Sequence, residues 1–544
     1  MIALPSAVIG LATAVLSGMS ILSGQVMAAT ADPAPAGQPA PTPGATPAPQ
    51  FAIVEYVVDG NSLLAEDVIE LAVSPFLGEA KTLRDVDGAR AALEKKYHDA
   101  GYLTVMVSIP EQRVDSGEVA LHVVEAGIDR LRVKGAEFTL PSGIKARIPE
   151  LAEGKVPNFN IVQQQLTALN RSADIKVTPV LRAGKLPGTV EVQLDAEDQL
   201  PVHGNVEYSN RQTPNTSAQR LSANLRYDNL WQRGHSFGLT LQTAPSRPRD
   251  ARVAVGTYVM PVGDNGNALS LFAVSSRSDF ASLANAPGLG LLGNSDTLGL
   301  RYMLAFGGDA SFTHNASVGF DRKRIGQTLI VLGGAGTNAS ISYMPVVTTY
   351  TARKASAQRI TVFDAGITAG LRGLGGNEDV KFNAKRESAS ASFIALRAGV
   401  QLTEELGKWS MFGKLDAQLA SGPLVPSEQY VAGGAESVRG YLEGERAADN
   451  GVHATFELRT PRYNPGHGDW RIGGLLFFDT ARLTILQPRF PQPAHEQLGG
   501  AGVGLRIGVP HGVSFELDAA RALTDGDTTR NGDKRVHARA IWGF

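Results

Sequence analysis

From about residue 200 to its end, the chain is built of short segments in which apolar and polar residues alternate. The segment SFELDAA, for example, sets Phe515 and Leu517 on one face against Glu516 and Asp518 on the other. Successive side chains of a strand point to opposite faces, so each segment predicts a β-strand with one apolar and one charged face. Because Gly, Asn and Asp separate the segments as turn residues do, a mostly β fold is expected here.

Two β architectures fit this alternation: a soluble sandwich or propeller, and a membrane barrel with lipid outside and water inside. The segment HATFELRT places Glu457 and Arg459 in succession on one strand face. A water-filled lumen accommodates such rows of charge, whereas a soluble β protein does not usually repeat them. The pattern therefore favours a transmembrane barrel, and about 345 residues at about 20 to 22 per strand and connection predict about 16 antiparallel strands.

The N-terminus, residues 1–28, is predicted to be a signal peptide for export. Residues 9–26 are mostly small and apolar, and Val26 and Ala28 suit the −3 and −1 positions of a cleavage site. The usual basic residue before the apolar run is missing. The alternative is a single transmembrane anchor, but Gly and Ser interrupt the run, and no later segment approaches about 18 apolar residues.

Composition and motifs argue against several classes of function. The chain has no cysteine, which excludes a disulfide framework, a zinc–thiolate site and a cysteine nucleophile. The net charge of −2 predicts no nucleic-acid partner. The ten histidines form no H-E-x-x-H pair, and no G-x-S-x-G elbow is present. We therefore predict no catalytic residue, no cofactor and no metal site.

Two further segments are expected to have no chemical role. GLGLLG, at 288–293, matches a dinucleotide-binding pattern but lacks the strand before and helix after it, so it is predicted to be an ordinary loop. The charged run at 321–324 is expected to be a solvated strand end or loop rim.

Residues 51–197 have a different, partly helical pattern that occurs twice. A linker rich in Pro, Ala and Gly, at 29–50, precedes them. In the first unit the apolar face of a predicted helix is formed by Val86, Ala89, Leu93 and Tyr97. Each unit is predicted to run strand, helix, helix, strand, strand. The predicted elements are 51–58, 65–73, 83–100, 103–109 and 118–124, then 131–133, 144–151, 159–171, 175–181 and 188–194.

Two motifs and the last residues complete the pattern. GGAESVRGYLEGE, at 433–445, is too rich in glycine for a helix and too charged for a buried strand. A predicted strand contains Phe477-Phe478-Asp479-Thr480-Ala481. The chain ends in VHARAIWGF, an alternating strand whose Trp542 and Phe544 would lie in an interfacial aromatic girdle.

Together these features resemble the outer-membrane transporters of two-partner secretion, the haemolysin activation/secretion (TpsB) proteins of the BamA-like superfamily. The resemblance covers residues 51–544 and is sharpest at the family's loop-6 motif, matched by Val438, Arg439, Gly440 and Tyr441. FFDTA resembles the family motif Phe-x-Asp-x-Gly, with Ala481 in place of glycine. Some members carry a plug helix before the first soluble module, but the Pro-rich segment here does not predict one.

The resemblance implies two periplasmic POTRA domains, at 51–125 and 126–197, and a transmembrane barrel at 200–544. A secreted partner protein would bind the POTRA domains and cross the outer membrane through the barrel. The alternatives are a barrel assembly factor, which usually has more POTRA domains, a passive porin, which needs none, and an outer-membrane hydrolase, which needs a Ser/His/Asp set.

The resemblance also implies roles for individual residues. The loop at 433–445 would fold into the lumen, where Arg439 would reach Asp479, with Phe477 beside it on the inner wall. Such a charge-assisted, bidentate contact in a wet lumen would contribute modest stability but fix the loop; the alternative is an exposed arginine without a partner. Trp542 and Phe544 resemble the recognition signal of the barrel assembly machinery.

Overall fold

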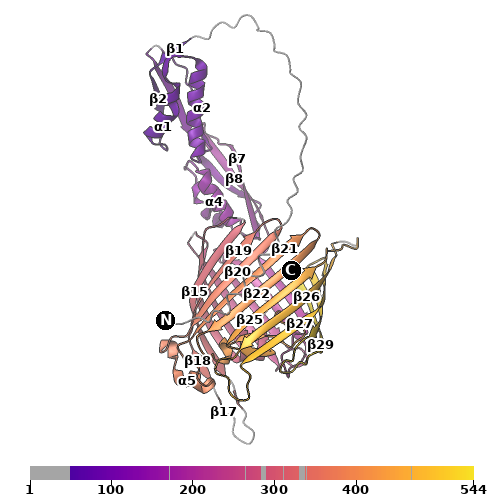
Figure 1. The fold of residues 1–544 in the computed structure, drawn as a ribbon. Coiled ribbons are helices and arrows are strands. Elements are labelled where there is room, and N and C mark those ends of the chain that lie inside the picture. The colour runs from indigo at the N-terminus through magenta and orange to yellow at the C-terminus, as the bar shows by residue number, and fades with distance from the viewer. Residues whose placement is uncertain are drawn as a thin grey trace.

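The computed structural model describes residues 50–114, 116–170, 172–263, 265–282, 290–309, 311–326, 328–329, 337–338, 340–466 and 469–544. The predicted signal peptide and nearly all of the predicted linker lie outside the described residues. Two small α/β units extend from one end of a β-barrel (Figure 1). Of the helices in the described ranges, none is both long and apolar enough to cross a membrane.

The first unit has the predicted order of elements, with a short extra ladder. Its sheet order is β2-β5-β4, and β2 runs parallel to β5. Helix α2 begins where the Asp85 carboxylate accepts the Thr82 N–H (2.8 Å). Its predicted apolar face is buried in the core of the unit, which confirms the helical spacing. The elements are β1 Phe51–Ile53, β2 Glu55–Asp59, α1 Glu66–Val73, η1 Ser74–Phe76, β3 Gly78–Lys81, α2 Leu83–Asp99, β4 Val105–Ser108 and β5 Glu118–Glu125.

The second unit repeats this arrangement, with sheet order β6-β8-β7. The helix expected over 144–151 is wrong in detail, because the segment divides into α3 and the 3-10 turn η2. Pro149 disfavours a helical conformation of Ile148, whose φ and ψ are −129° and 62°. The elements are β6 Gly127–Lys134, α3 Pro141–Ala146, η2 Pro149–Leu151, α4 Phe159–Leu169, β7 Ile175–Ala183 and β8 Thr189–Asp198.

Residues from Val202 onward form a closed antiparallel barrel. Both β18 and β19 pair with β15, so they form one interrupted strand and the barrel has 16 strands, as expected. These are β9 Val202–Ser209, β10 Arg220–Leu230, β11 His235–Thr243, β12 Ala251–Val262, β13 Asn267–Ser282, β14 Gly290–Ala305, β15 Phe312–Gly326, β18 Ile341–Tyr343 with β19 Val346–Ala355, β20 Arg359–Ala369, β21 Ile394–Leu406, β22 Trp409–Ala420, β25 Asn450–Arg459, β26 Arg471–Thr484, β27 His495–Val509, β28 Val513–Ala522 and β29 Lys534–Gly543.

The connections contain the remaining short elements. They are β16 Thr328–Leu329, β17 Thr337–Asn338, η3 Leu374–Gly376, α5 Asp379–Lys385, η4 Pro426–Glu428, β23 Tyr430–Ala432 and β24 Arg446–Ala448. α5 lies at the end of the barrel opposite the two units (Figure 1). The turn between β10 and β11 contacts the second unit, since Gln232 Oε1 accepts the Leu140 N–H (3.0 Å) and Gln232 Nε2 donates to Phe138 O (3.1 Å).

The predicted alternation of faces is present in the barrel wall. Phe237 and Leu241 are exposed on its outside, whereas Glu457 and Asp518 are buried. The expectation for GLGLLG is wrong, because Gly290 to Gly293 belong to β14 and Gly290 to Leu292 pair with β13; the two residues before them lie outside the described ranges.

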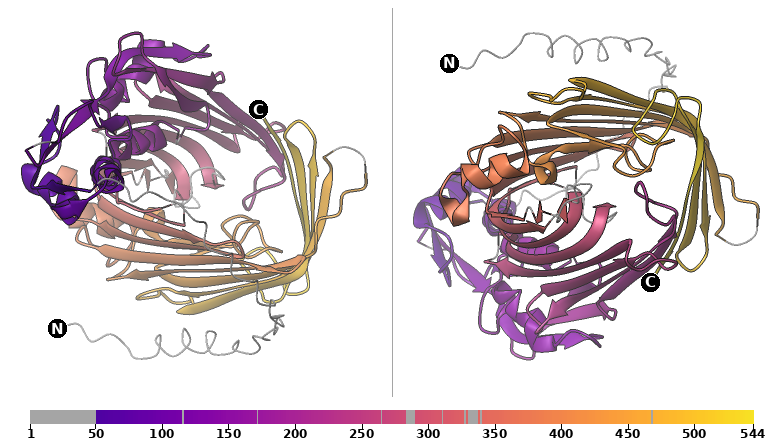
Figure 2. Two further views of the ribbon diagram at one scale, coloured as in Figure 1. Left: turned by 90° about the horizontal axis from the view of Figure 1, so that it is seen from above. Right: turned by 90° about the horizontal axis from the view of Figure 1, so that it is seen from below.

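The barrel closes between its first and last strands, β9 and β29, where the ladder is short (Figure 2). Five residues of β29 pair with β9, against fourteen pairs between β26 and β27. The side chain of Asn210 extends the contact, accepting the Ala538 N–H (2.8 Å) and donating to Val536 O (2.7 Å). At the other end of the seam, Phe544 N donates to Gly204 O (2.9 Å) and Gly204 N donates to Phe544 O (3.0 Å).

Candidate functional site in the barrel lumen

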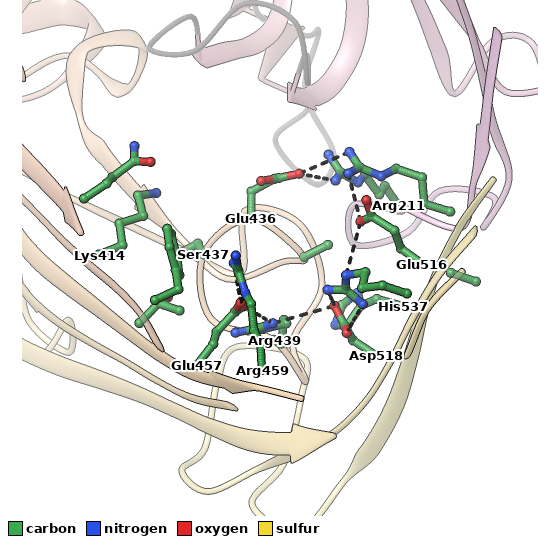
Figure 3. Close-up of a pocket in the computed structure, with 17 residues that line it drawn as sticks. Arg211, Lys414, Glu436, Ser437, Arg439, Glu457, Arg459, Glu516, Asp518 and His537 are labelled. Atoms are coloured by element: carbon green, nitrogen blue, oxygen red, sulfur yellow. Dashed lines mark hydrogen bonds and ion pairs between the residues drawn. The ribbon is translucent and has the colours of Figure 1, made fainter. Parts of the chain in front are cut away.

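The connection between β22 and β25, residues 421–449, folds back into the barrel; we call it the lumenal loop. The short strands β23 and β24 pair with each other in its stem. The predicted motif lies at its tip, where the loop meets the inner faces of β25 to β29 (Figure 3).

Arg439 at this tip contacts Asp479 on β26 by three hydrogen bonds. Its Nε donates to Asp479 Oδ2 (2.7 Å) and its Nη2 to Asp479 Oδ1 (2.9 Å), which makes the contact bidentate. Its backbone N–H donates to Asp479 Oδ2 (3.1 Å). Arg439 is 4% exposed and Asp479 0% exposed. The predicted contact is therefore present, and both residues are almost fully buried.

Further side chains complete the environment of the Arg439 guanidinium. Its carbon lies 3.6 Å from the centroid of the Phe477 ring, so the guanidinium stacks on the residue predicted beside Asp479. Nη1 donates to Glu457 Oε1 on β25 (2.7 Å) and lies 3.7 Å from Asp518 Oδ2 on β28. The arginine thus faces three carboxylates from three strands. Glu457 and Asp518 were predicted only to lie on charged strand faces, not to be its partners.

Two glycines allow the loop to approach the wall. Gly440 has a φ of +102°, in the left-handed region that favours glycine, and its N–H donates to His537 Nε2 on β29 (3.0 Å). A Cβ on Gly500 of β27 would lie 2.0 Å from the Arg439 carbonyl oxygen. Neither His537 nor Gly500 was predicted as part of the site, because no local motif marks them.

The other two motif residues, Val438 and Tyr441, are fully buried. The Tyr441 hydroxyl lies 2.7 Å from Thr524 O and 2.9 Å from Gly499 O. Ala481 belongs to the same buried apolar cluster, so its methyl group fills space beside the motif where the family pattern has glycine. The cluster comprises Ala432, Val438, Tyr441, Ala448, Ala481, Leu483, Ile485, Leu498 and Ala522.

The three glutamates of GGAESVRGYLEGE also have defined partners. Glu436 pairs with Arg211, which follows β9, and lies 3.5 Å from Arg539 on β29. Glu443 accepts the Ala435 N–H within the loop (2.9 Å). Glu445 accepts two backbone N–H groups of the β28–β29 connection, from Thr528 and Thr529 (2.7 Å each). Glu436 and Glu445 therefore connect the loop to other parts of the barrel, although the Glu436 side chain is 54% exposed.

The wall around the tip carries an ion-pair network. Arg506 Nη1 contacts Asp518 Oδ1 (2.6 Å), and Arg539 Nη2 contacts Glu516 Oε2 (2.8 Å). The charged run at 321–324 lies in β15, on the opposite wall of the barrel. It was expected to be a solvated strand end or loop rim. Asp321 pairs with Arg301 (2.7 Å) and is buried, so the expectation of a solvated run is wrong for Asp321, whereas Arg322 and Arg324 are exposed near the end of β15.

Among the described residues, Asp174, His203 and Asp228 bring three metal-ligating atoms within 4.8 Å of one another. They lie where the second unit joins the barrel. His203 Nε2 is 2.8 Å from Asp174 Oδ1, and Arg226 Nε donates to Asp228 Oδ2 (2.9 Å). Because these ion pairs already satisfy both carboxylates, we assign no metal to the cluster.

Trp542 and Phe544 lie on the outside of the barrel, at the end nearer the two units. They are 50% and 57% exposed, and their ring centroids are 5.3 Å apart. This is the position of an aromatic girdle at a membrane interface. Their role as an assembly signal stays a prediction.

Comparison with known proteins finds relatives of both the periplasmic units and the barrel. The sequence model of the haemolysin secretion/activation protein family ShlB/FhaC/HecB matches residues 188–507, and that of the ShlB-type POTRA domain matches residues 51–126. The outer membrane transporter CdiB of Dickeya dadantii (strain 3937) is 25% identical over 422 residues, covering 75% of this chain and 72% of the relative.

Two solved structures share the fold. CdiB from Escherichia coli aligns with a TM-score of 0.63 at 19% identity, over 92% of each chain. BamA from Haemophilus ducreyi lacking POTRA domains 1–3 aligns with a TM-score of 0.53 at 14% identity, over 91% of this chain and 100% of that one. From the match over more than half its length, the chain belongs to the ShlB/FhaC/HecB family and is an outer-membrane transporter of two-partner protein secretion, with its POTRA region in the periplasm.

Proposed function

We propose that the chain uses two POTRA domains, at 51–125 and 126–197, to receive an unfolded exoprotein in the periplasm and deliver it to the barrel at 200–544. The POTRA match over 51–126 and the shared order of elements in both units support this division. The contact of Gln232 with the second unit supports a position of that unit at the periplasmic end of the barrel. The cargo is a large exoprotein of the haemolysin or adhesin type with an N-terminal secretion domain.

The exoprotein binds by adding a strand to a sheet edge of the first unit. Backbone pairing at an edge holds an extended chain without requiring one sequence. The sheet has two edges, β2 and β4. The β4 edge is partly closed, because the Glu94 carboxylate accepts the Val107 N–H (3.1 Å). The β2 edge, where Val57 is 45% exposed, is therefore the docking edge.

Translocation uses no nucleotide or other cofactor and no catalytic residue. Folding of the exoprotein outside the cell withdraws it from the lumen and drives transport. The chain contacts outer-membrane lipid through its barrel, and the barrel assembly machinery through Trp542 and Phe544 during biogenesis. It has no nucleic-acid partner.

The observation that carries this proposal is the docked tip of the lumenal loop. Arg439 on the loop and Asp479 on β26 are buried together, and the loop tip lies inside the barrel against its wall (Figure 3). The loop is held by this ion pair and by the apolar cluster around Val438 and Tyr441, so a passing chain must break both contacts to displace it. We therefore assign Arg439 and Asp479 as the lock that positions the loop between transport events.

The proposal is tested by comparing the surface and culture-supernatant proteins of cells with and without this chain. Mass spectrometry should detect loss of one or a few large exoproteins in the deletion strain, and their return on complementation. No loss from either fraction, while the complemented strain contains inserted barrel, would contradict the proposal.

A barrel assembly factor is the second candidate, favoured by the fold shared with BamA. The same experiment separates the two functions. Loss of an assembly factor depletes many integral outer-membrane proteins together, whereas loss of a dedicated transporter leaves them unchanged.

A further inference from the structure

A second buried arginine–carboxylate pair lies at the outer end of the lumenal loop, away from the predicted motif. Arg386 directly follows α5, and Asp449 directly precedes β25. Arg386 Nη2 donates to Asp449 Oδ2 (2.7 Å), and Nη1 contacts Asp449 Oδ1. Their side chains are 17% and 0% exposed. A bidentate pair this buried has a fixed geometry, because an unpaired partner would be costly.

The pair also binds the backbones of two neighbouring segments. Asp449 accepts the N–H groups of Leu424 (2.9 Å) and Leu486 (2.7 Å). Arg386 donates to the carbonyl oxygens of the same two residues, at 2.8 Å and 3.0 Å. One ion pair thus joins the β20–β21 connection, the lumenal loop and the β26–β27 connection. These contacts use both Nη atoms of Arg386 and both carboxylate oxygens of Asp449.

Two of these residues mark the two ends of the lumenal loop. Leu424 lies shortly after β22, and Asp449 is the last residue before β25. Gln418 adds to their closure, since its Nε2 donates to Glu428 O (3.0 Å) and Asp449 O (2.9 Å). The outgoing and returning limbs are therefore fastened to each other and to the barrel rim.

We propose that Arg386 and Asp449 form a neck clasp, a second anchor that sets how far the lumenal loop reaches into the barrel and so places Arg439 against Asp479. They are positioning residues, because neither touches the tip. The inference rests on the proposed function of the loop as a lock. When the tip is displaced, the clasp keeps the neck in place so that the loop returns to the same position.

The chain provides a matched control for this idea. Glu387, next to Arg386, pairs with Arg489. This pair also joins the β20–β21 connection to the β26–β27 connection, but at the surface of the protein. These side chains are 57% and 73% exposed. Exposed ion pairs contribute little, so Glu387→Gln should not move the loop.

The test uses purified full-length protein carrying Ala435→Cys, the only cysteine in an otherwise cysteine-free chain. Ala435 is half-buried near the tip, and the rate of maleimide labelling reports its opening. Arg386→Gln and Asp449→Asn should each raise this rate about ten-fold, because local opening limits access. Arg386→Lys, which keeps charge but loses the planar fork, should raise it less. Glu387→Gln should leave it unchanged.

Folding is checked separately by heat-modifiable migration of the barrel. If Arg386→Gln or Asp449→Asn does not insert, the labelling rate of Arg386→Lys is compared with that of the parent instead. Rates within two-fold of the parent for folded Arg386 and Asp449 variants would overturn the proposal. An equal rise with Glu387→Gln would overturn it too, since any loosening of the rim would then suffice. Because labelling needs no exoprotein, its failure is distinct from failure of the secretion assay that tests the proposed function.

Discussion

The two periplasmic units and the barrel bury opposite kinds of side chain. In the first unit Leu93, Tyr97 and Leu121 are 0% exposed and pack in an apolar core. In the barrel wall many apolar side chains face outward, and the buried interior holds Arg439 and Asp479 beside the apolar cluster around Tyr441. Apolar burial stabilises roughly in proportion to area and is not directional. Buried charges instead require specific partners.

This difference indicates which substitutions should damage each region. A unit with an apolar core tolerates shape-conserving changes but loses stability when a core side chain is truncated. The barrel closes through its own strand pairing, so its charged interior can change without loss of the fold. We therefore expect changes in the units to act through recruitment or local stability, and changes in the lumen to act on transport while the barrel persists.

The largest expected effect separates the two regions. Deletion of residues 51–125, with the N-terminal residues retained, should abolish export of the exoprotein. The barrel should still insert, because its backbone hydrogen bonds are made among its own strands. Export is measured in culture supernatants, and insertion by heat-modifiable migration from outer membranes. Normal export by the deletion variant would remove the recruiting role of the first unit.

Substitutions of Arg439 and Asp479 should have the second-largest effect on export. Arg439→Ala should lower export about ten-fold or more, because it leaves the buried Asp479 carboxylate without its cationic partner. Asp479→Ala should have a smaller effect, since Glu457 still pairs with Arg439 (2.7 Å). Arg439→Lys should not restore export, because lysine lacks the planar fork. Barrel levels should remain near normal; a barrel lost in proportion to export would show that the pair serves the fold.

Changes at the chain end should reduce the amount of barrel, not its activity. Phe544→Ala, and more so loss of both Trp542 and Phe544, should lower insertion in purified outer membranes. Export per inserted barrel should stay constant. Phe478→Ala, which removes an exposed aromatic ring from the middle of the barrel wall, is the control and should insert normally. Wild-type insertion of both terminal variants would argue that the assembly signal lies elsewhere.

A core truncation in the first unit should cost stability locally. Leu93→Ala should lower its free energy of unfolding by about 2–5 kcal/mol, because a cavity replaces a fully buried side chain. Leu71→Ala, at a position that is 69% exposed, is the matched control. Limited proteolysis of the intact protein measures the difference. Equal resistance of the two variants would contradict the assigned core.

The smallest predicted effect is a pH-dependent change in the stability of the second unit. Burial alone would raise the pKa of Asp198, but hydrogen bonds from the backbone N–H groups of Glu137, Thr139 and Phe138 lower it. A lowered folded pKa gives stability that is present above about pH 4, near the unfolded value, and is lost as pH falls through the folded value.

Asp198→Asn should therefore lower the free energy of unfolding by about 1–2 kcal/mol at pH 7. The difference from the parent should shrink as pH falls below about 4. Thermal unfolding at several pH values measures it, with the exposed Glu137→Gln as control. A difference that is the same at acid and neutral pH would contradict the account.

The periodicity of apolar residues predicted the parts of the molecule in which one spacing repeats over many residues. The face Val86, Ala89, Leu93 and Tyr97 follows helical spacing, and Phe237, Leu239 and Leu241 follow strand alternation, so both were predictable. The break at Pro149 was readable from the restriction that proline places on Ile148, but the apolar run outweighed it.

The candidate site was predictable only where a local motif marks it. Arg439 and Asp479 lie in recognisable motifs, so their contact was expected. Glu457 was placed on the correct strand face, but alternation does not specify register between strands and could not bring it to Arg439. His537 and Arg386 contact the lumenal loop through register and loop closure, which no local spacing encodes.

The central claim is that Arg439 and Asp479 act as one lock on the lumenal loop. A double-mutant cycle tests it most directly, by measuring export per inserted barrel for Arg439→Ala, Asp479→Ala and the two together. The account predicts that the double variant exports no less than Arg439→Ala alone, because the second change removes a contact already lost. Defects that simply multiply, or a single variant that exports normally, would contradict it.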